Sequence, residues 1–230
     1  MTDGLAAIFL HGSYEEPGYY VAWAEVADLV VAADGGARFL LEHGLTPDLV
    51  VGDFDSLAPD RVAGLADAGV ELVRHPVRKD FTDGELAADE ARRRGAGEVV
   101  LAGALGALDH TLGHLALLRR LEAGGVAARL VSPRLTVRVL TAPARVVLDA
   151  PTGTRVSVAP LGGDALVSLA GLAYPLARGL LPADRCLGLG NSVTAGAAAS
   201  IELHEGVAAL LVESASETFG GACRGQIGGR

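Results

Sequence analysis

Two aspartates separated by one residue, Asp53 and Asp55, are the strongest chemical signal in the sequence. They follow a short apolar run and Gly52, so the carboxylates come directly after a predicted buried strand. Side chains alternate along an extended segment, which would point both carboxylates the same way and Phe54 toward the core. Such close like charges repel unless a cation lies between them, and Mg²⁺, an oxygen-liganded ion that commonly carries phosphates, would satisfy both. A solvated turn, in which aspartate is common, explains the pair equally well.

Two further acidic positions also follow predicted strands. Asp34 precedes Gly35 and Gly36, and glycines at a helix start allow the backbone to come close to a ligand. Most turns of that kind are purely structural. Asp109 and His110 open a later helix, on which His110 and His114 would also be ordinary polar residues.

The segment from Lys79 to Glu85 combines the only lysine of the chain with two more aspartates. Thr82 is a favourable N-cap and Glu85 lies three residues later, so the capping-box pattern predicts the start of a helix. Capping leaves Asp80 and Asp83 unexplained, although acidic residues at a helix start also suit the helix dipole. Lys79 beside them could contact a phosphate.

These residues need a scaffold that brings them together. Residues 1–132 alternate apolar strands and helices, which is typical of a parallel sheet with helices on both faces. The predicted strands cover residues 5–11, 29–33, 49–51, 70–73, 98–102 and 127–131; the predicted helices cover 19–28, 37–43, 59–68, 82–94 and 111–122, the last burying Leu112, Leu115, Leu118 and Leu121. Five acids follow strands or begin helices and should therefore line one crevice at the carboxyl ends of the strands: Asp34, Asp53, Asp55, Asp80 and Asp109.

After Ser132 the pattern changes to short β-rich runs separated by turns. These runs cover residues 134–140, 145–149, 154–159, 165–169, 186–189, 199–203 and 208–213. Such a pattern is typical of a compact antiparallel domain. We therefore predict an α/β protein with a Rossmann-like three-layer domain and mostly parallel sheet at 1–132, a smaller antiparallel β-sandwich domain at 133–214, and a loose tail at 215–230.

Composition limits the classes of protein that the chain could be. The 230 residues are 50% hydrophobic but only 4% aromatic, which predicts a core of Ala, Val and Leu. A formal net charge of −9 argues against a nucleic-acid partner. Cys186 and Cys223 form no zinc-binding spacing. With no signal peptide and no apolar run of membrane-spanning length, we expect a soluble, cytoplasmic protein without a membrane partner.

Several stretches together resemble the thiamine pyrophosphokinase family. The similarity runs in order through roughly residues 30–213 and includes Asp34-Gly35-Gly36-Ala37, Gly52-Asp53-Phe54-Asp55-Ser56-Leu57, Lys79-Asp80-Phe81-Thr82-Asp83, Asp109-His110-Thr111-Leu112, Gly171-Leu172-Ala173-Tyr174-Pro175-Leu176 and Leu189-Gly190-Asn191-Ser192. The resemblance implies an α/β nucleotide-binding domain followed by a small β-sandwich. It also implies transfer of a pyrophosphoryl group from ATP to the thiamine hydroxyl with Mg²⁺, release of AMP, and a homodimer that binds thiamine between domains of different subunits.

On this resemblance we assign roles to individual residues. The expected Mg²⁺ ligands are Asp53, Asp55 and Asp80. Asp83 would complete the metal shell or accept the hydroxyl proton, and Lys79 and Arg78 would neutralise phosphate charge. Asp34 and the amides of Gly35 and Gly36 would hold the nucleotide, Asp109 and His110 would line the same cleft, and Asn191 and Ser192 would contact the thiamine pyrimidine.

Three departures from the family pattern leave alternatives open. The family's arginine before Asp109 is missing, so a phosphate contact is absent or supplied by Arg78. Arg38 stands where the family often has asparagine, and Gly190 stands where it has serine. The alternatives are the same transfer to another acceptor, such as a pterin hydroxymethyl group, a metal-dependent hydrolase or sugar-nucleotide transferase that uses Asp53 and Asp55, and a non-catalytic nucleotide sensor.

Overall fold

The computed structural model describes residues 4–77, 80–196 and 198–213 of the chain. The contacts within it divide the chain into two compact units between Ser132 and Pro133. The predicted tail at 215–230 lies outside the described residues, as do Arg78 and Lys79.

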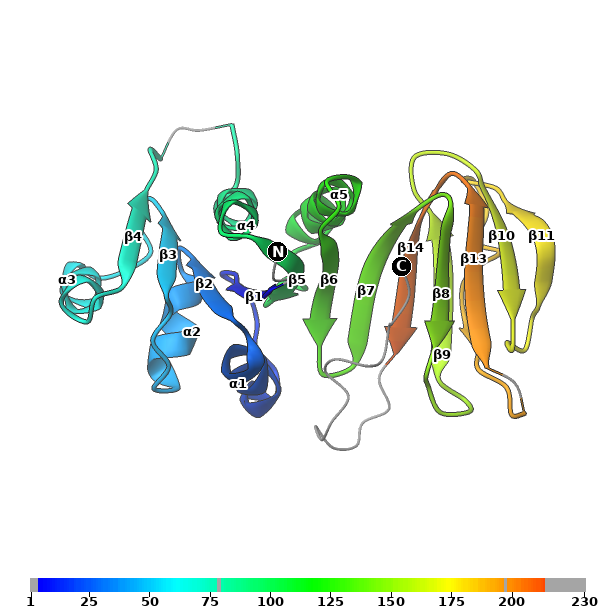
Figure 1. Ribbon diagram of the computed structural model, residues 1–230, viewed down its shortest axis with the longest axis horizontal. Coiled ribbons are helices and arrows are strands. Elements are labelled where there is room, and N and C mark those ends of the chain that lie inside the picture. Colours follow the sequence, from blue (N-terminus) through cyan, green and yellow to red (C-terminus); the bar gives the residue numbers. More distant parts are fainter. Residues whose placement is uncertain (1–3, 78–79, 197, 214–230) are drawn as a thin grey trace. The chain divides into compact units, whose positions relative to one another are not determined.

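The first unit is a parallel sheet flanked by helices (Figure 1). Its strands lie in the order β6-β5-β1-β2-β3-β4, and all neighbours are parallel. The strands are β1 (Gly4–Phe9), β2 (Leu29–Ala33), β3 (Leu49–Gly52), β4 (Glu71–Arg74), β5 (Ala96–Ala102) and β6 (Ala127–Ser132), and the helices are α1 (Pro17–Val26), α2 (Gly36–Glu42), α3 (Pro59–Asp67), α4 (Asp83–Arg93) and α5 (Leu108–Ala123).

The strand order reverses next to β1. The chain moves outward from β1 through β2 and β3 to β4, then returns through α4 to β5 on the other side of β1. Figure 1 shows α4 and α5 on one face of this sheet and α1 and α2 on the other. Since the strands are parallel, the loops that follow β1, β2, β3 and β5 all emerge at one edge, which is where ligands bind in sheets of this kind.

The core of the first unit consists mainly of the expected Ala, Val and Leu residues. The central strands β1, β2, β3 and β5 are mostly apolar and largely buried, as expected where both faces of a parallel sheet are covered, whereas both ends of the edge strand β4 are exposed. The few aromatic residues, however, are concentrated on one side of the sheet, where Phe9, Tyr14 and Phe39 stack with ring centroids 4.0–6.3 Å apart. Composition could not reveal this clustering, because it counts residues without placing them.

The second unit consists of two antiparallel sheets with the strand orders β12-β9-β14-β7 and β11-β10-β13-β8. Its strands are β7 (Leu135–Thr141), β8 (Ala144–Leu148), β9 (Arg155–Pro160), β10 (Ala165–Ala170), β11 (Leu176–Leu181), β12 (Asn191–Ser192), β13 (Ala199–Glu205) and β14 (Val207–Glu213). Alternate residues of both sheets, such as Val158 from one and Ile201 from the other, are buried in a single aliphatic cluster. This core has the predicted Ala, Val and Leu character.

Two local predictions were wrong. Residues 186–189 form turns instead of a strand, and Leu187 and Leu189 are exposed. The strand in this region is β11, whose apolar pattern is interrupted by Arg178 and Gly179 because only part of it faces the core. In α5, Leu112 is 57% exposed and Leu117 is buried in its place.

The broad fold class is confirmed: a mostly parallel α/β sheet precedes a region of antiparallel strands. No helix within the described residues is both long enough and apolar enough to cross a membrane.

Candidate active site

The register between β2 and β3 brings together acids that lie far apart in the sequence. Ala33 is paired with Val51, and the N–H of Asp34 donates a 2.8 Å hydrogen bond to the carbonyl oxygen of Val51. Asp34, the first residue after β2, therefore lies beside the Asp53 turn that follows β3.

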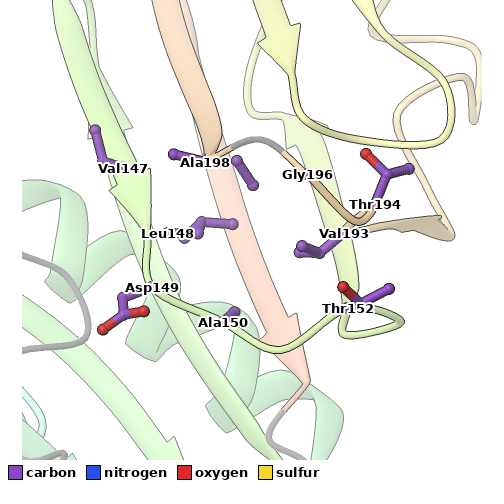
Figure 2. A pocket seen from close by; sticks show the side chains of 10 residues that line it. Val147, Leu148, Asp149, Ala150, Thr152, Val193, Thr194, Gly196 and Ala198 are labelled. Carbon is purple, nitrogen blue, oxygen red and sulfur yellow. The ribbon is translucent and has the colours of Figure 1, made fainter.

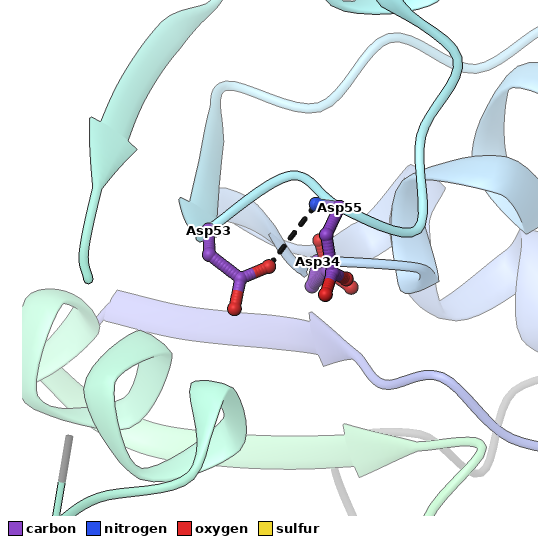
Figure 3. A group of neighbouring side chains, drawn as sticks. All are labelled: Asp34, Asp53 and Asp55. Atoms are coloured by element: carbon purple, nitrogen blue, oxygen red, sulfur yellow. Dashed lines mark hydrogen bonds between the residues drawn. The ribbon is translucent and has the colours of Figure 1, made fainter. Parts of the chain in front are cut away.

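Three carboxylates converge at this point (Figure 3). One oxygen from each of Asp34, Asp53 and Asp55 lies within 4.8 Å of the others. Asp34 is only 7% exposed, Asp53 is half-buried and Asp55 is exposed. We call these three residues the acid cluster.

The buried member of the acid cluster has an oxygen with no protein partner. Oδ2 of Asp34 accepts a hydrogen bond from the Ser56 hydroxyl. Its Oδ1 is buried and has no hydrogen-bond partner among the described residues. Burying a carboxylate oxygen without compensation is costly, so Oδ1 has the properties of an atom that receives an external cation or donor.

The turn itself is not extended, contrary to the prediction from alternating side chains. Phe54 has a φ of 65° and is buried, while the N–H of Asp55 donates to Oδ1 of Asp53 at 3.0 Å. The carboxylates do lie together and Phe54 does point into the core, as predicted. A tight turn with a left-handed residue produces that arrangement, and alternation along a strand does not.

A fourth carboxylate approaches from α4. A Cβ placed on Gly52 would lie 2.9 Å from Cβ of Asp34 and 3.2 Å from Oδ1 of Asp83, so Asp83 lies against the same short stretch of backbone. The pKa of Asp55 is raised, chiefly by the charge of Asp53, with further contributions from desolvation, Asp34 and Asp83. The site therefore concentrates negative charge, which favours a cation.

Residues 20–129, which carry all four of these carboxylates, match the family model described as "Thiamin pyrophosphokinase, catalytic domain". This stretch is identified as a thiamin pyrophosphokinase catalytic domain. Comparison with curated proteins gives no match.

Solved structures extend the similarity beyond this thiamin pyrophosphokinase domain to both units of the chain. A thiamin pyrophosphokinase from Geobacillus thermodenitrificans is 27% identical, with a TM-score of 0.74 over 92% of this chain and 98% of its own. A thiamine pyrophosphokinase from Bacillus subtilis has a TM-score of 0.78 at 22% identity, over 92% of this chain and 99% of its own. Yeast thiamin pyrophosphokinase has a TM-score of 0.77 at 14% identity, over 93% of this chain and 87% of its own. At 22% and 14% identity, the last two similarities show a shared fold alone.

In the thiamin pyrophosphokinase domain, Gly35 and Gly36 are needed for internal packing. A Cβ on Gly36 would lie 1.9 Å from the carbonyl oxygen of Phe9, and one on Gly35 would lie 2.7 Å from the His11 ring. These glycines thus pack against the end of β1 and against His11, two residues beyond it, and the predicted close approach of their backbone to a ligand stays a prediction. Their amides as nucleotide donors stay a prediction.

Thr82 and Glu85 form the predicted capping box at the start of α4. Oγ1 of Thr82 accepts the N–H of Glu85 at 3.2 Å, and the N–H of Thr82 donates to the Glu85 carboxylate at 2.9 Å. This cap fixes the first turn of α4 and with it Asp83. Asp80 is exposed and belongs to no cluster of possible metal ligands among the described residues, so its assignment as a ligand stays a prediction.

Asp109 and His110 lie in the first turn of α5, which follows the loop after β5. Both are exposed, and Oδ1 of Asp109 accepts the N–H of His110 at 2.9 Å. His114, one turn later, bonds through Nδ1 to the carbonyl oxygen of Ala104 at 2.8 Å. Burial is the main cause of the lowered pKa of His114. Asp109 and His110 lie at the predicted sheet edge, and their nucleotide contacts stay a prediction.

In the second unit, Asn191 and Ser192 form β12. Asn191 is buried, and its Oδ1 accepts the N–H groups of Tyr174 and Ser192, at 3.0 and 2.9 Å. Its Nδ2 donates to the carbonyl oxygen of Tyr174 at 2.8 Å. These contacts give Asn191 a positioning role for the turn at Tyr174. Contact of Asn191 or Ser192 with a pyrimidine stays a prediction.

The second unit also contains a cavity of about 330 Å³ (Figure 2). It lies between the end of β8 and the segment that leads into β13, with Val147 and Asp149 on one side and Thr152, Val193 and Thr194 on the other. Asp149 is the only charged residue among the described residues that line it. None of the predicted site residues lines this cavity.

The residues of the acid cluster fit a divalent metal ion. They supply three carboxylates from two turns and a buried oxygen without a protein partner, and oxygen ligands of this kind suit Mg²⁺. Asp34 was not among the predicted metal ligands. Its position in the sequence could have identified it. Asp34 follows one predicted strand and Asp53 follows the next, and if these two strands are neighbours in a parallel sheet, the loops after them are neighbours too.

Proposed function

We propose that the protein transfers a pyrophosphoryl group from ATP to the hydroxyl of thiamine, giving thiamine diphosphate and AMP, in a reaction that requires Mg²⁺. The observation that carries the proposal is the acid cluster with the unpartnered Oδ1 of Asp34, inside a domain identified as a thiamin pyrophosphokinase catalytic domain.

In this reaction the thiamine hydroxyl oxygen bonds to the β-phosphorus of ATP, the bond from that phosphorus to the α–β bridging oxygen breaks, and AMP leaves. Most of the catalysis in such transfers comes from positioning and from neutralising charge on phosphate oxygens. Mg²⁺ held by the acid cluster supplies that neutralisation when bound. Asp80 is proposed as a further ligand, directly or through water.

The protein's own groups supply the remaining steps. Asp83 lies against the acid cluster and is proposed to complete the metal shell or to accept the hydroxyl proton. Arg78 and Lys79, which lie outside the described residues, are proposed to contact phosphates. Gly35 and Gly36 after β2, and Asp109 and His110 after β5, follow strands whose ends lie at one sheet edge, which supports their assignment to the nucleotide.

We further propose a Rossmann-like description of the first unit and a β-sandwich description of the second, supported by the strand order and by the shared aliphatic cluster. A cytoplasmic homodimer with thiamine contacts from Asn191 and Ser192 completes the proposal. Light scattering of the purified protein tests the dimer.

The decisive experiment incubates the purified protein with ATP, Mg²⁺ and thiamine and measures products by mass. We expect AMP and thiamine diphosphate in equal amounts, and Asp55→Asn should form neither. Products that appear only with a pterin acceptor would identify the other transferase. Binding of ATP without any AMP would identify a nucleotide sensor, which the missing arginine before Asp109 would then explain.

A further inference from the structure

Two arginines hold the turn that carries Asp53 and Asp55, and they do so through main-chain carbonyl groups. Nη2 of Arg38, on α2, donates to the carbonyl oxygen of Ser56 at 2.9 Å. Nη1 of Arg74, at the end of β4, donates to the carbonyl oxygen of Asp53 at 3.0 Å. The turn is thus held at its first and last residues from two different elements.

Further contacts tie the side chains of the turn in place. The guanidinium of Arg74 lies over the Phe54 ring, with Cζ 4.7 Å from the ring centroid. The hydroxyl of Ser56 donates to Oδ2 of Asp34, which leaves Oδ1 of Asp34 without a partner among the described residues. We call Arg38, Arg74 and Ser56 the brace.

We propose that the brace positions the carboxylates of the acid cluster for a divalent cation. This inference rests on the proposed function only in assuming that the acid cluster binds a cation. A turn with a left-handed residue and mutually repelling carboxylates would separate its charges if it were free to move. By bonding to carbonyl oxygens, the arginines fix the main chain of the turn. Partners of this kind, one step removed from a metal, orient the ligands and strongly affect affinity.

Electrostatics alone predicts the opposite effect of removing an arginine. The loss of a positive charge near the acid cluster makes the site more negative and should tighten cation binding. Loss of the brace should instead weaken cation binding. The sign of the change therefore separates positioning from simple charge balance.

The test measures Mn²⁺ binding by calorimetry, with no nucleotide or thiamine present. We expect Arg38→Ala and Arg74→Ala each to bind Mn²⁺ about tenfold more weakly than the unmodified protein. Arg61→Ala is the matched control, because Arg61 is exposed on α3, loses the same charge and has no described side-chain contact. Its Mn²⁺ affinity should be unchanged or slightly higher.

A second pair of variants tests the hydroxyl. Ser56→Ala should weaken Mn²⁺ binding and Ser56→Thr, which retains a hydroxyl, should restore most of it. This pair keeps the test decisive should an arginine variant fold poorly. In the transferase assay, brace variants should need more Mg²⁺ for half-maximal rate and retain most of kcat at saturating Mg²⁺.

Unchanged or tighter Mn²⁺ binding in both arginine variants would overturn the inference. So would the absence of Mn²⁺ binding by the unmodified protein. Failure of the proposed function is a separate result. If the protein forms no thiamine diphosphate but the brace variants still bind Mn²⁺ more weakly, the proposed reaction is wrong and the positioning role is retained.

Discussion

Asp34 is the most informative residue to change, because it is the buried member of the acid cluster. Asp34→Asn keeps the shape of the side chain and an oxygen that can accept the Ser56 hydroxyl, and asparagine tolerates the φ of 42° found here. The substitution removes one negative charge and one metal ligand. We expect it to abolish metal binding without harming the fold.

The magnitude follows from the distances in the acid cluster. An oxygen of Asp34 lies within 4.8 Å of one of Asp53. Two unit charges at that limit repel by about 1 kcal/mol in water and about 3.5 kcal/mol at an effective dielectric constant of 20. Since a chain of this size changes its Tm by roughly 2–4 °C for each kcal/mol, Asp34→Asn should have a Tm in EDTA that is higher by a few degrees.

The assay compares thermal unfolding in EDTA and in excess Mg²⁺. A metal that saturates the native site to about 100 times its Kd stabilises by about 2.7 kcal/mol, so the unmodified protein should gain several degrees on adding Mg²⁺. Asp34→Asn should gain almost nothing. Asp67→Asn, an exposed carboxylate at the end of α3, is the matched control and should behave like the unmodified protein.

Two results would refute this reasoning. A normal Mg²⁺-dependent gain in Asp34→Asn would mean that Asp34 is not a ligand. A Tm in EDTA that falls by several degrees would mean that the Asp34 charge stabilises the fold more than repulsion within the acid cluster destabilises it.

Three other predictions concern single residues. Because Asp53 raises the pKa of Asp55, folding disfavours the ionised form of Asp55. The metal-free protein should therefore gain stability as the pH falls through that raised pKa, and Asp55→Asn should flatten the dependence of Tm on pH measured in EDTA. Gly36→Ala should prevent normal folding, judged by soluble yield and circular dichroism, because its Cβ would lie 1.9 Å from a backbone oxygen. The control Gly64→Ala, inside α3, adds a Cβ that meets no atom within 4 Å and should be neutral or stabilising by about 0.5–1 kcal/mol. Asn191→Ala should lower the free energy of unfolding by about 1–3 kcal/mol in urea titrations, because it leaves buried backbone groups without partners; a near-zero change would reject the positioning role.

Hydrophobic periodicity was sufficient to predict the alternating half of the fold. The central strands there are apolar runs that are largely buried, and each helix is separated from the next strand by a turn, so the pattern can be recognised without knowledge of contacts. The β-region was harder. β11 faces the core only in part, so its sequence lacks the expected alternation, while the exposed apolar residues Leu187 and Leu189 imitate a strand.

The site could be predicted in its residue types and only partly in its geometry. Asp53 and Asp55 are separated by one residue, so their proximity is a local property of the chain. The membership of Asp34 depends on the pairing of Ala33 with Val51, and the approach of Asp83 depends on the packing of α4 against Gly52. Neither relation is encoded in a short stretch of sequence.

The brace shows why departures from a family pattern are difficult to interpret from sequence. In the sequence, Arg38 is only a residue that replaces asparagine, and nothing next to it in the chain indicates what its charge contacts. Its hydrogen bond to the carbonyl oxygen of Ser56 exists because the left-handed conformation of Phe54 turns the chain at that point. The backbone of the turn therefore determines both the spacing of the acid cluster and the hydrogen bond of an arginine outside it, and charge alone predicts the opposite sign from the proposed brace for the effect of removing that arginine on cation binding.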